Sequence, residues 1–196
     1  MRIIKIVLCF LIILSFVSCG ESEFMNLYAF TDNYNKTSES KLNISDFYFQ
    51  NDQKGTYTAF LGDTGYEVLL TVKSEESDII EEVQISIIKD KSAPPDNAQL
   101  VLFCNTLRNT LRAFCNYDTE QAETIISAFE LNDNSTFAKE GELTLTQNNF
   151  HFVYYSTKLI SQIMIYNTYL HKIEETEKPV SKPYYAEDFI IKNQPD

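Results

Sequence analysis

The sequence predicts an α+β domain with one antiparallel sheet of about six strands, built from two α-β-β-β halves, and with its helices packed on one face. Helical patterns of period 3.6 recur twice, and each is followed by three β-rich runs. The chain has 196 residues, of which 44% are apolar and 13% aromatic, enough to form a sizeable core. Because a sheet and a helix each bury their apolar side against another layer, two layers are expected.

The first half is expected to span about residues 26–90. Its helix is predicted where Leu27, Phe30 and Tyr34 recur at helical spacing. Its last strand is predicted where apolar and polar residues alternate, which indicates a strand with one wet face. The predicted elements are a helix at 25–35, a polar loop at 37–43, and strands at 55–61, 66–73 and 82–86.

The second half is expected to span about residues 96–174. Asp96 is a predicted N-cap for a long helix with an apolar stripe, and Asp118 is a predicted N-cap for a second, shorter helix. The predicted elements are helices at 97–116 and 119–129 and strands at 141–146, 150–155 and 159–166. The strand at 150–155 is apolar or aromatic on both sides, which does not fit a sheet with one open face.

The two halves follow the same order of elements, so an internal duplication is one interpretation. Few residues are identical between them, and the other interpretation is that any two β-meanders share this plan. A duplicated arrangement would join all six strands in one twisted sheet.

The N-terminal residues have the pattern of a secretory signal peptide. Arg2 and Lys5 precede a short apolar run, and Ser18 stands directly before Cys19. The run is much shorter than the roughly 20 residues that cross a bilayer. This segment resembles the signals of bacterial lipoproteins, although Phe16 stands where leucine is usual. The resemblance implies cleavage before Cys19 and lipidation of its thiol. An ordinary cleaved signal, or a retained anchor, is the alternative.

These patterns divide the chain into four parts. The expected parts are a signal peptide at 1–18, a lipidated tether at 19–25, an α+β domain at 26–174, and an irregular C-terminal tail at 175–196. The expected location is the extracytoplasmic face of the cell membrane, reached through the lipid on Cys19.

The charge of the chain limits its partners. The formal net charge is −12, and removal of residues 1–18 would leave 14 basic against 28 acidic residues. Such a surface repels phosphate, so nucleic acid is not expected as a partner. Attachment to a membrane is expected to depend on the lipid rather than on a basic patch.

The sequence contains no motif for catalysis, a metal or a cofactor. It has no nucleophile elbow, zinc-protease motif or phosphate-binding glycine loop. Cys104 and Cys115 lie about 16 Å apart along one predicted helix, too far for a disulfide unless that helix breaks. His151 is expected to face the sheet surface. The protein is therefore not expected to be an enzyme.

Two groups of residues are candidates for binding. Arg108 and Arg112 lie four residues apart, where they could clamp a carboxylate or phosphate, or simply form ion pairs with nearby acidic residues. Tyr154, Tyr155 and Tyr166 belong to an aromatic-rich pair of strands. They could form a contact surface or a shallow groove, or be covered by the helices and the tail.

Four segments carry a wider resemblance, which covers residues 25–180. They are MNLYAFTDNYN, GTYTAFL, FVYYSTKLISQIMIYNTYL and KPV. They are similar to segments of uncharacterised small lipoproteins of Gram-positive anaerobic bacteria, and the order of elements resembles the tandem α-β repeats of the β-lactamase-inhibitor-like group. The resemblance implies a fold and a location but no catalytic or inhibitory residue.

The function expected from the sequence is that of a non-enzymatic lipoprotein that binds a protein or peptide outside the cytoplasmic membrane. A small-molecule or envelope-polymer binding lipoprotein of the same architecture is the alternative. A deep pocket that includes Arg108 and Arg112 would favour the alternative, whereas a flat aromatic patch would favour the protein or peptide partner.

Overall fold

The computed structural model describes most of the predicted α+β domain. The described residues are 25–49, 55–62, 68–74, 79–89, 97–131, 137 and 139–170. The predicted signal peptide, Cys19, the N-cap Asp96 and the tail at 175–196 lie outside them.

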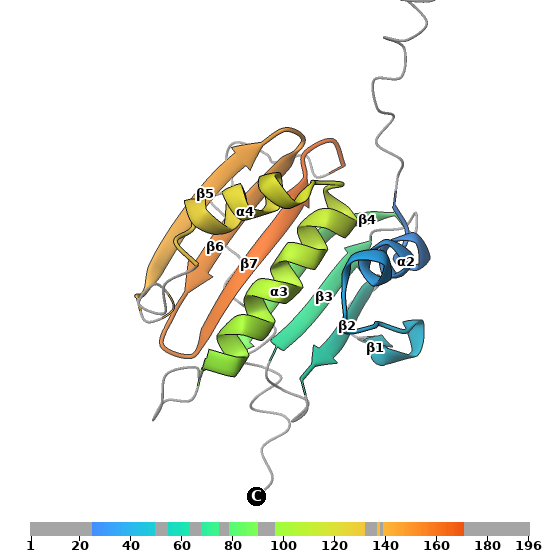
Figure 1. Cartoon of the computed structure of the whole chain (residues 1–196), viewed down its shortest axis with the longest axis horizontal. Coiled ribbons are helices and arrows are strands. Elements are labelled where there is room, and N and C mark those ends of the chain that lie inside the picture. Colours follow the sequence, from blue (N-terminus) through green and yellow to red (C-terminus); the bar gives the residue numbers. More distant parts are fainter. Residues whose placement is uncertain are drawn as a thin grey trace, which may run out of the picture.

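The described strands form one antiparallel sheet, as predicted, but the sheet has seven strands and not six (Figure 1). The order across the sheet is β1-β2-β3-β4-β7-β6-β5. The strands are β1 (Phe47–Phe49), β2 (Thr56–Leu61), β3 (Val68–Ser74), β4 (Ile80–Ile88), β5 (Gly141–Gln147), β6 (Phe150–Ser156) and β7 (Ile160–Asn167). The additional strand is β1, which is too short to show a period of two.

Two meanders meet in the middle of the sheet. β2, β3 and β4 follow one another on one side, and β5, β6 and β7 do so on the other, with β4 paired to β7. Ile85 lies opposite Ile163 in this central pair. The same order would result from two similar halves or from any two meanders joined through their last strands.

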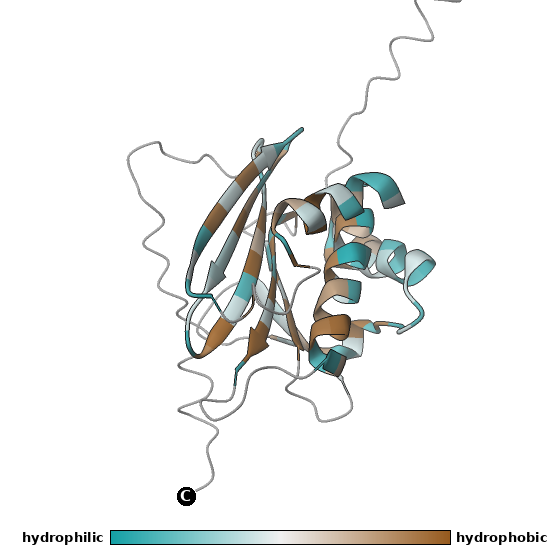
Figure 2. Ribbon diagram, turned by 60° about the vertical axis from the view of Figure 1, so that its left-hand side comes forward, coloured by the Kyte–Doolittle hydropathy of each residue, from teal (hydrophilic) through white to brown (hydrophobic). Residues whose placement is uncertain are grey.

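The α-helices of the described residues lie on one side of the sheet (Figure 2), and a short 3-10 helix, η1 (Ile44–Asp46), precedes β1. The α-helices are α2 (Leu27–Thr37), α3 (Asn97–Phe114) and α4 (Thr119–Ala128). The predicted start of α4 is confirmed, because the Asp118 carboxylate accepts from the Gln121 backbone N–H at 2.8 Å and the Gln121 side chain accepts from the Asp118 N–H at 3.0 Å. This capping box satisfies backbone groups that a helix start leaves unpaired.

The core lies between the sheet and the helices. Leu107 and Leu111 of α3 and Ile85 and Ile163 of the central strands are all 0% exposed. Because side chains alternate between the two faces of a strand, the residues between these apolar ones point to the other side. We call that other side the helix-free face, since no helix of the described residues lies on it (Figure 2).

One glycine is required by the backbone at the start of β2. Gly55 has φ of +79°, and a Cβ built on it would lie 1.7 Å from the backbone oxygen of Ser74. The Ser74 N–H donates to the Gly55 oxygen at 2.9 Å. A side chain at this position would therefore push apart the end of β3 and the beginning of β2.

Candidate functional site

The structure separates the predicted binding residues into three places. Arg108 and Arg112 lie on α3, Tyr154 lies in the core, and Tyr155 and Tyr166 lie on the helix-free face. They do not form one site.

Arg108 is held by an ion pair between two helices. Its Nε donates to the Glu123 carboxylate of α4, and its Nη1 donates to the Asn105 Oδ1 at 2.7 Å. Of the two roles expected for this arginine, clamping an anion or pairing with a nearby acidic residue, the structure shows the second. Arg112 lies one turn further along α3 and is half-buried. An arginine already paired in this way is a weaker candidate for clamping an anion, because the ligand would have to displace Glu123.

Tyr154 belongs to the core and not to an exposed surface. It is 3% exposed, and its ring centroid lies 6.2 Å from that of Phe129 and 6.4 Å from that of Phe137. Its hydroxyl donates to the Ser161 Oγ at 3.3 Å. Burial raises the pKa of Tyr154, so the phenol stays neutral and keeps this hydrogen bond.

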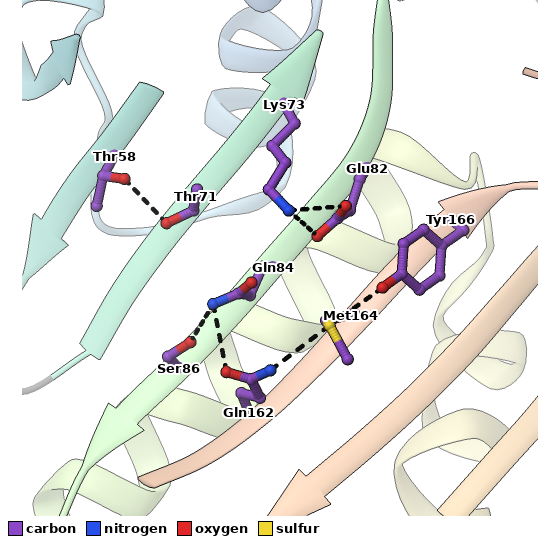
Figure 3. A network of polar contacts seen from close by, with 9 residues as sticks. All are labelled: Thr58, Thr71, Lys73, Glu82, Gln84, Ser86, Gln162, Met164 and Tyr166. Carbon is purple, nitrogen blue, oxygen red and sulfur yellow. Dashed lines mark hydrogen bonds and ion pairs between the residues drawn. The ribbon is translucent and has the colours of Figure 1, made fainter. Parts of the chain in front are cut away.

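Neighbouring strands are joined on the helix-free face by hydrogen bonds between polar side chains (Figure 3). The Gln84 Nε2 donates to the Ser86 Oγ at 2.9 Å and to the Gln162 Oε1 at 3.4 Å. The hydroxyls of Thr58 and Thr71 lie 3.0 Å apart. Gln84 and Gln162 are only 6% and 2% exposed, so these bonds satisfy groups that would otherwise be costly to bury.

An ion pair continues this network toward one end of β3 and β4. The Lys73 Nζ donates to both carboxylate oxygens of Glu82, at 2.8 and 2.9 Å. Next to Glu82, the Tyr166 hydroxyl donates to the Met164 sulfur at 3.1 Å. Burial raises the pKa of Tyr166, and the charges of Glu82 and Glu142 raise it further, so this phenol remains a neutral donor.

Tyr48 of β1, opposite Thr58, is 63% exposed at one edge of this face, and further accessible aromatic side chains lie toward β5 and β6. Tyr155 faces Gln162 across the strands, and His151 faces Tyr166. The His151 Nδ1 lies 2.8 Å from the Thr146 Oγ1, and its ring centroid lies 6.4 Å from that of Tyr166. Tyr155 and His151 are both half-buried and are four residues apart on β6, a distance of about 13 Å. Each ring has apolar surface and a polar atom that can form a hydrogen bond.

The two cysteines of the described residues are not in environments that would activate a thiol. Cys104 and Cys115 are free thiols, and burial raises the pKa of each. The Cys104 Sγ donates to the Leu131 backbone oxygen at 3.4 Å. No three His, Cys, Asp or Glu side chains of the described part come together as a metal site would require.

Sequence reasoning did not identify the glutamine pair or the Lys73–Glu82 pair. The alternation at 82–86 indicated that Glu82, Gln84 and Ser86 share a polar face, but it did not indicate the cross-strand partners, Lys73 of β3 and Gln162 of β7. Gln84 and Gln162 are 78 residues apart. Only the pairing of β4 with β7 brings them together.

The fold and this surface define a class: an α+β protein with one layer of helices on one side of its sheet, and with polar cross-links and tyrosines on the side that no described helix covers. Comparison with protein-family models, curated proteins and solved structures finds no match for this chain. None of the helices in the described part of the chain is long and apolar enough to cross a bilayer.

Proposed function

We propose that the chain is a membrane-anchored bacterial lipoprotein that binds a protein or peptide on the extracytoplasmic side and has no enzymatic role. Lipidation of Cys19 would attach it to the membrane, and the domain at 26–174 would carry the binding surface. The pattern of Arg2, Lys5, the apolar run and Cys19 supports the anchor. The two meanders that meet at β4 and β7 are compatible with a duplicated domain.

The observation that carries the binding proposal is the placement of Tyr155 and Tyr166. Both are half-buried on the face that no described helix covers, beside polar groups that are already hydrogen-bonded. Tyrosines with one apolar side and one hydrogen-bonding group are enriched in protein interfaces. Because Arg108 is engaged by Glu123, the small-molecule alternative gains no support from this arginine.

The anchor can be tested by metabolic labelling with a palmitate analogue. The wild type is expected to take up the label, and Cys19→Ala is expected to lose it and to leave the membrane fraction. An unlabelled wild type would contradict the anchor without affecting the binding proposal.

The binding surface can be tested by chemical crosslinking in intact cells followed by mass spectrometry. Tyr155→Ala should reduce the yield of the crosslinked partner, and Tyr28→Ala should not, because Tyr28 is 68% exposed on α2, in the helix layer. Both variants remove one tyrosine from the surface, so a change in charge cannot explain a difference. Equal yields from the two variants would contradict the assignment of the binding surface to the helix-free face.

A further inference from the structure

Among the described residues, one edge of the sheet is a complete strand that pairs on one side only. β5 (Gly141–Gln147) is the last strand in the described sheet and pairs with β6 through all seven of its residues. In an antiparallel strand, alternate residues direct their N–H and C=O groups away from the paired neighbour. The outer side of β5 therefore presents a row of backbone donors and acceptors that can pair with another strand.

β5 has few of the features that normally protect an edge strand. Natural edges are kept from pairing by short length, proline, a bulge or charged side chains, lysine above all. β1, at the opposite edge, is only three residues long. β5 has seven residues, no proline and no lysine, and its register with β6 is continuous. Its only charged residue is Glu142.

The side chains beside this edge define the chemistry of an added strand. Glu142, Thr144 and Thr146 are exposed on the helix-free side, and Leu143 is 46% exposed on the helix side. Glu142 lies opposite Tyr155 of β6. A strand beside β5 would thus meet apolar surface at alternate residues and a carboxylate and hydroxyls at the others.

The charge of the protein favours a basic partner. The chain carries a formal net charge of −12, and the only charge on β5 is negative. A second copy would bring the same net charge to the edge, whereas a basic peptide is attracted to it. Strand addition obtains its affinity from main-chain hydrogen bonds and its specificity from alternate side chains, which suits an extended peptide.

We propose that β5 binds an extended, positively charged segment of a partner protein as an eighth strand of the sheet. The inference rests on the proposed peptide-binding function and adds to it the mode of binding and the chemistry of the partner. Residues on the helix-free side of the added strand are basic and lie near Glu142, and those on the helix side are apolar and lie near Leu143.

The test uses the full chain in detergent micelles and a synthetic heptapeptide, Val-Lys-Val-Lys-Val-Lys-Val, with its termini blocked. Fluorescence anisotropy of a labelled peptide gives the affinity, and hydrogen exchange followed by mass spectrometry locates the protected amides. We expect slower exchange in residues 141–147. The matching peptide with glutamate in place of lysine should bind more weakly.

Two N-methylated peptides test the strand geometry. One carries N-methyl groups on its lysines and the other on its valines, so each removes the N–H groups that point to one edge of the added strand. One of the two should lose binding and the other should retain it. Equal binding of both peptides would overturn strand addition in favour of contact through side chains alone.

Charge reversal at the edge provides the protein variants. Glu142→Lys should lower the affinity for the lysine peptide by about three- to tenfold, because an exposed ion pair is lost and a repulsion is added. Glu39→Lys is the control, since it makes the same change of charge on the exposed segment that follows α2. An equal loss in both variants would show a general charge effect and overturn the assignment to β5.

Two further outcomes would overturn the inference. One is the absence of protection in residues 141–147 at millimolar lysine peptide. The other is a concentration-dependent dimer of the chain alone, seen by ultracentrifugation, with those same residues protected, which would make a second copy the occupant. Crosslinking in cells could identify a partner that depends on Tyr155 while the peptide fails to bind. That combination would support the proposed function and refute strand addition at β5.

Discussion

The register of β6 makes a sharp prediction about two adjacent tyrosines. Tyr154 points into the core, where it is 3% exposed and lies against Phe129 and Phe137. Tyr155 is half-buried on the opposite face. A slip of one residue in the pairing with β7 would exchange the two positions, so replacing each tyrosine in turn tests the sheet itself.

The expected difference in stability follows from these surroundings. Tyr154→Ala should lower the free energy of unfolding by about 4 kcal/mol, the range for removing a buried aromatic ring. The lost hydrogen bond to Ser161 accounts for about 1 kcal/mol of this total, and no more, because the Ser161 hydroxyl keeps Ser156 as a partner at 3.1 Å. Tyr155→Ala should lower the free energy of unfolding by only about 1 kcal/mol, the size of one cross-strand side-chain pair.

The assay is urea denaturation of each variant followed by far-ultraviolet circular dichroism. If Tyr154→Ala does not fold, Tyr154→Phe and Tyr155→Phe can replace the alanine pair, because the first loses a buried hydrogen bond worth about 1 kcal/mol. A cost for Tyr155→Ala that equals or exceeds the cost for Tyr154→Ala would refute the assigned register and the location of Tyr155 on the helix-free face.

Three further predictions concern the fold and its pH dependence. Gly55→Ala should destabilise the protein by several kcal/mol in the same urea assay, because the new Cβ would overlap the Ser74 oxygen; a neutral result would refute the turn geometry. Thr110→Val should raise the free energy of unfolding by about 1 kcal/mol, because the Thr110 hydroxyl is buried with no hydrogen-bond partner in the described structure; a loss of stability would show that the hydroxyl is bonded. Burial raises the pKa of Tyr117 from 10 to about 12, and its hydroxyl donates to the Gln147 oxygen at 2.9 Å. The stability from this neutral phenol is therefore complete below pH 10 and is lost as the pH rises toward 12. The advantage of the wild type over Tyr117→Phe, about 1 kcal/mol at pH 8, should shrink over that range, and a constant difference would contradict the raised pKa.

Much of the fold could be predicted because local patterns determine it. The alternation at 82–86 indicated a strand, and the residues from Asp118 to Gln121 indicated a helix start; both are present. β1 could not be found in this way, since its three residues are too few to show a period and become a strand only by pairing with β2.

The candidate site was harder to predict because it depends on register. Tyr154 and Tyr155 are the same residue type in a strand that is apolar on both faces, so the sequence alone could not assign one to the core. The pairing of Tyr154 with Ile163 and of Tyr155 with Gln162 places Tyr154 on the core side and Tyr155 on the helix-free side. Likewise, Glu123 becomes the partner of Arg108 only when α4 packs beside α3.

We propose that the helix-free side near β5 and β6 meets a partner outside the membrane. Photo-crosslinking in intact cells tests it most directly, with benzoylphenylalanine placed at Tyr155 or, as a control, at Tyr28. We predict a crosslinked species of higher mass from Tyr155 and little from Tyr28, formed on the outer side of the membrane. Equal crosslinking from the two positions, or none from Tyr155, would contradict the claim.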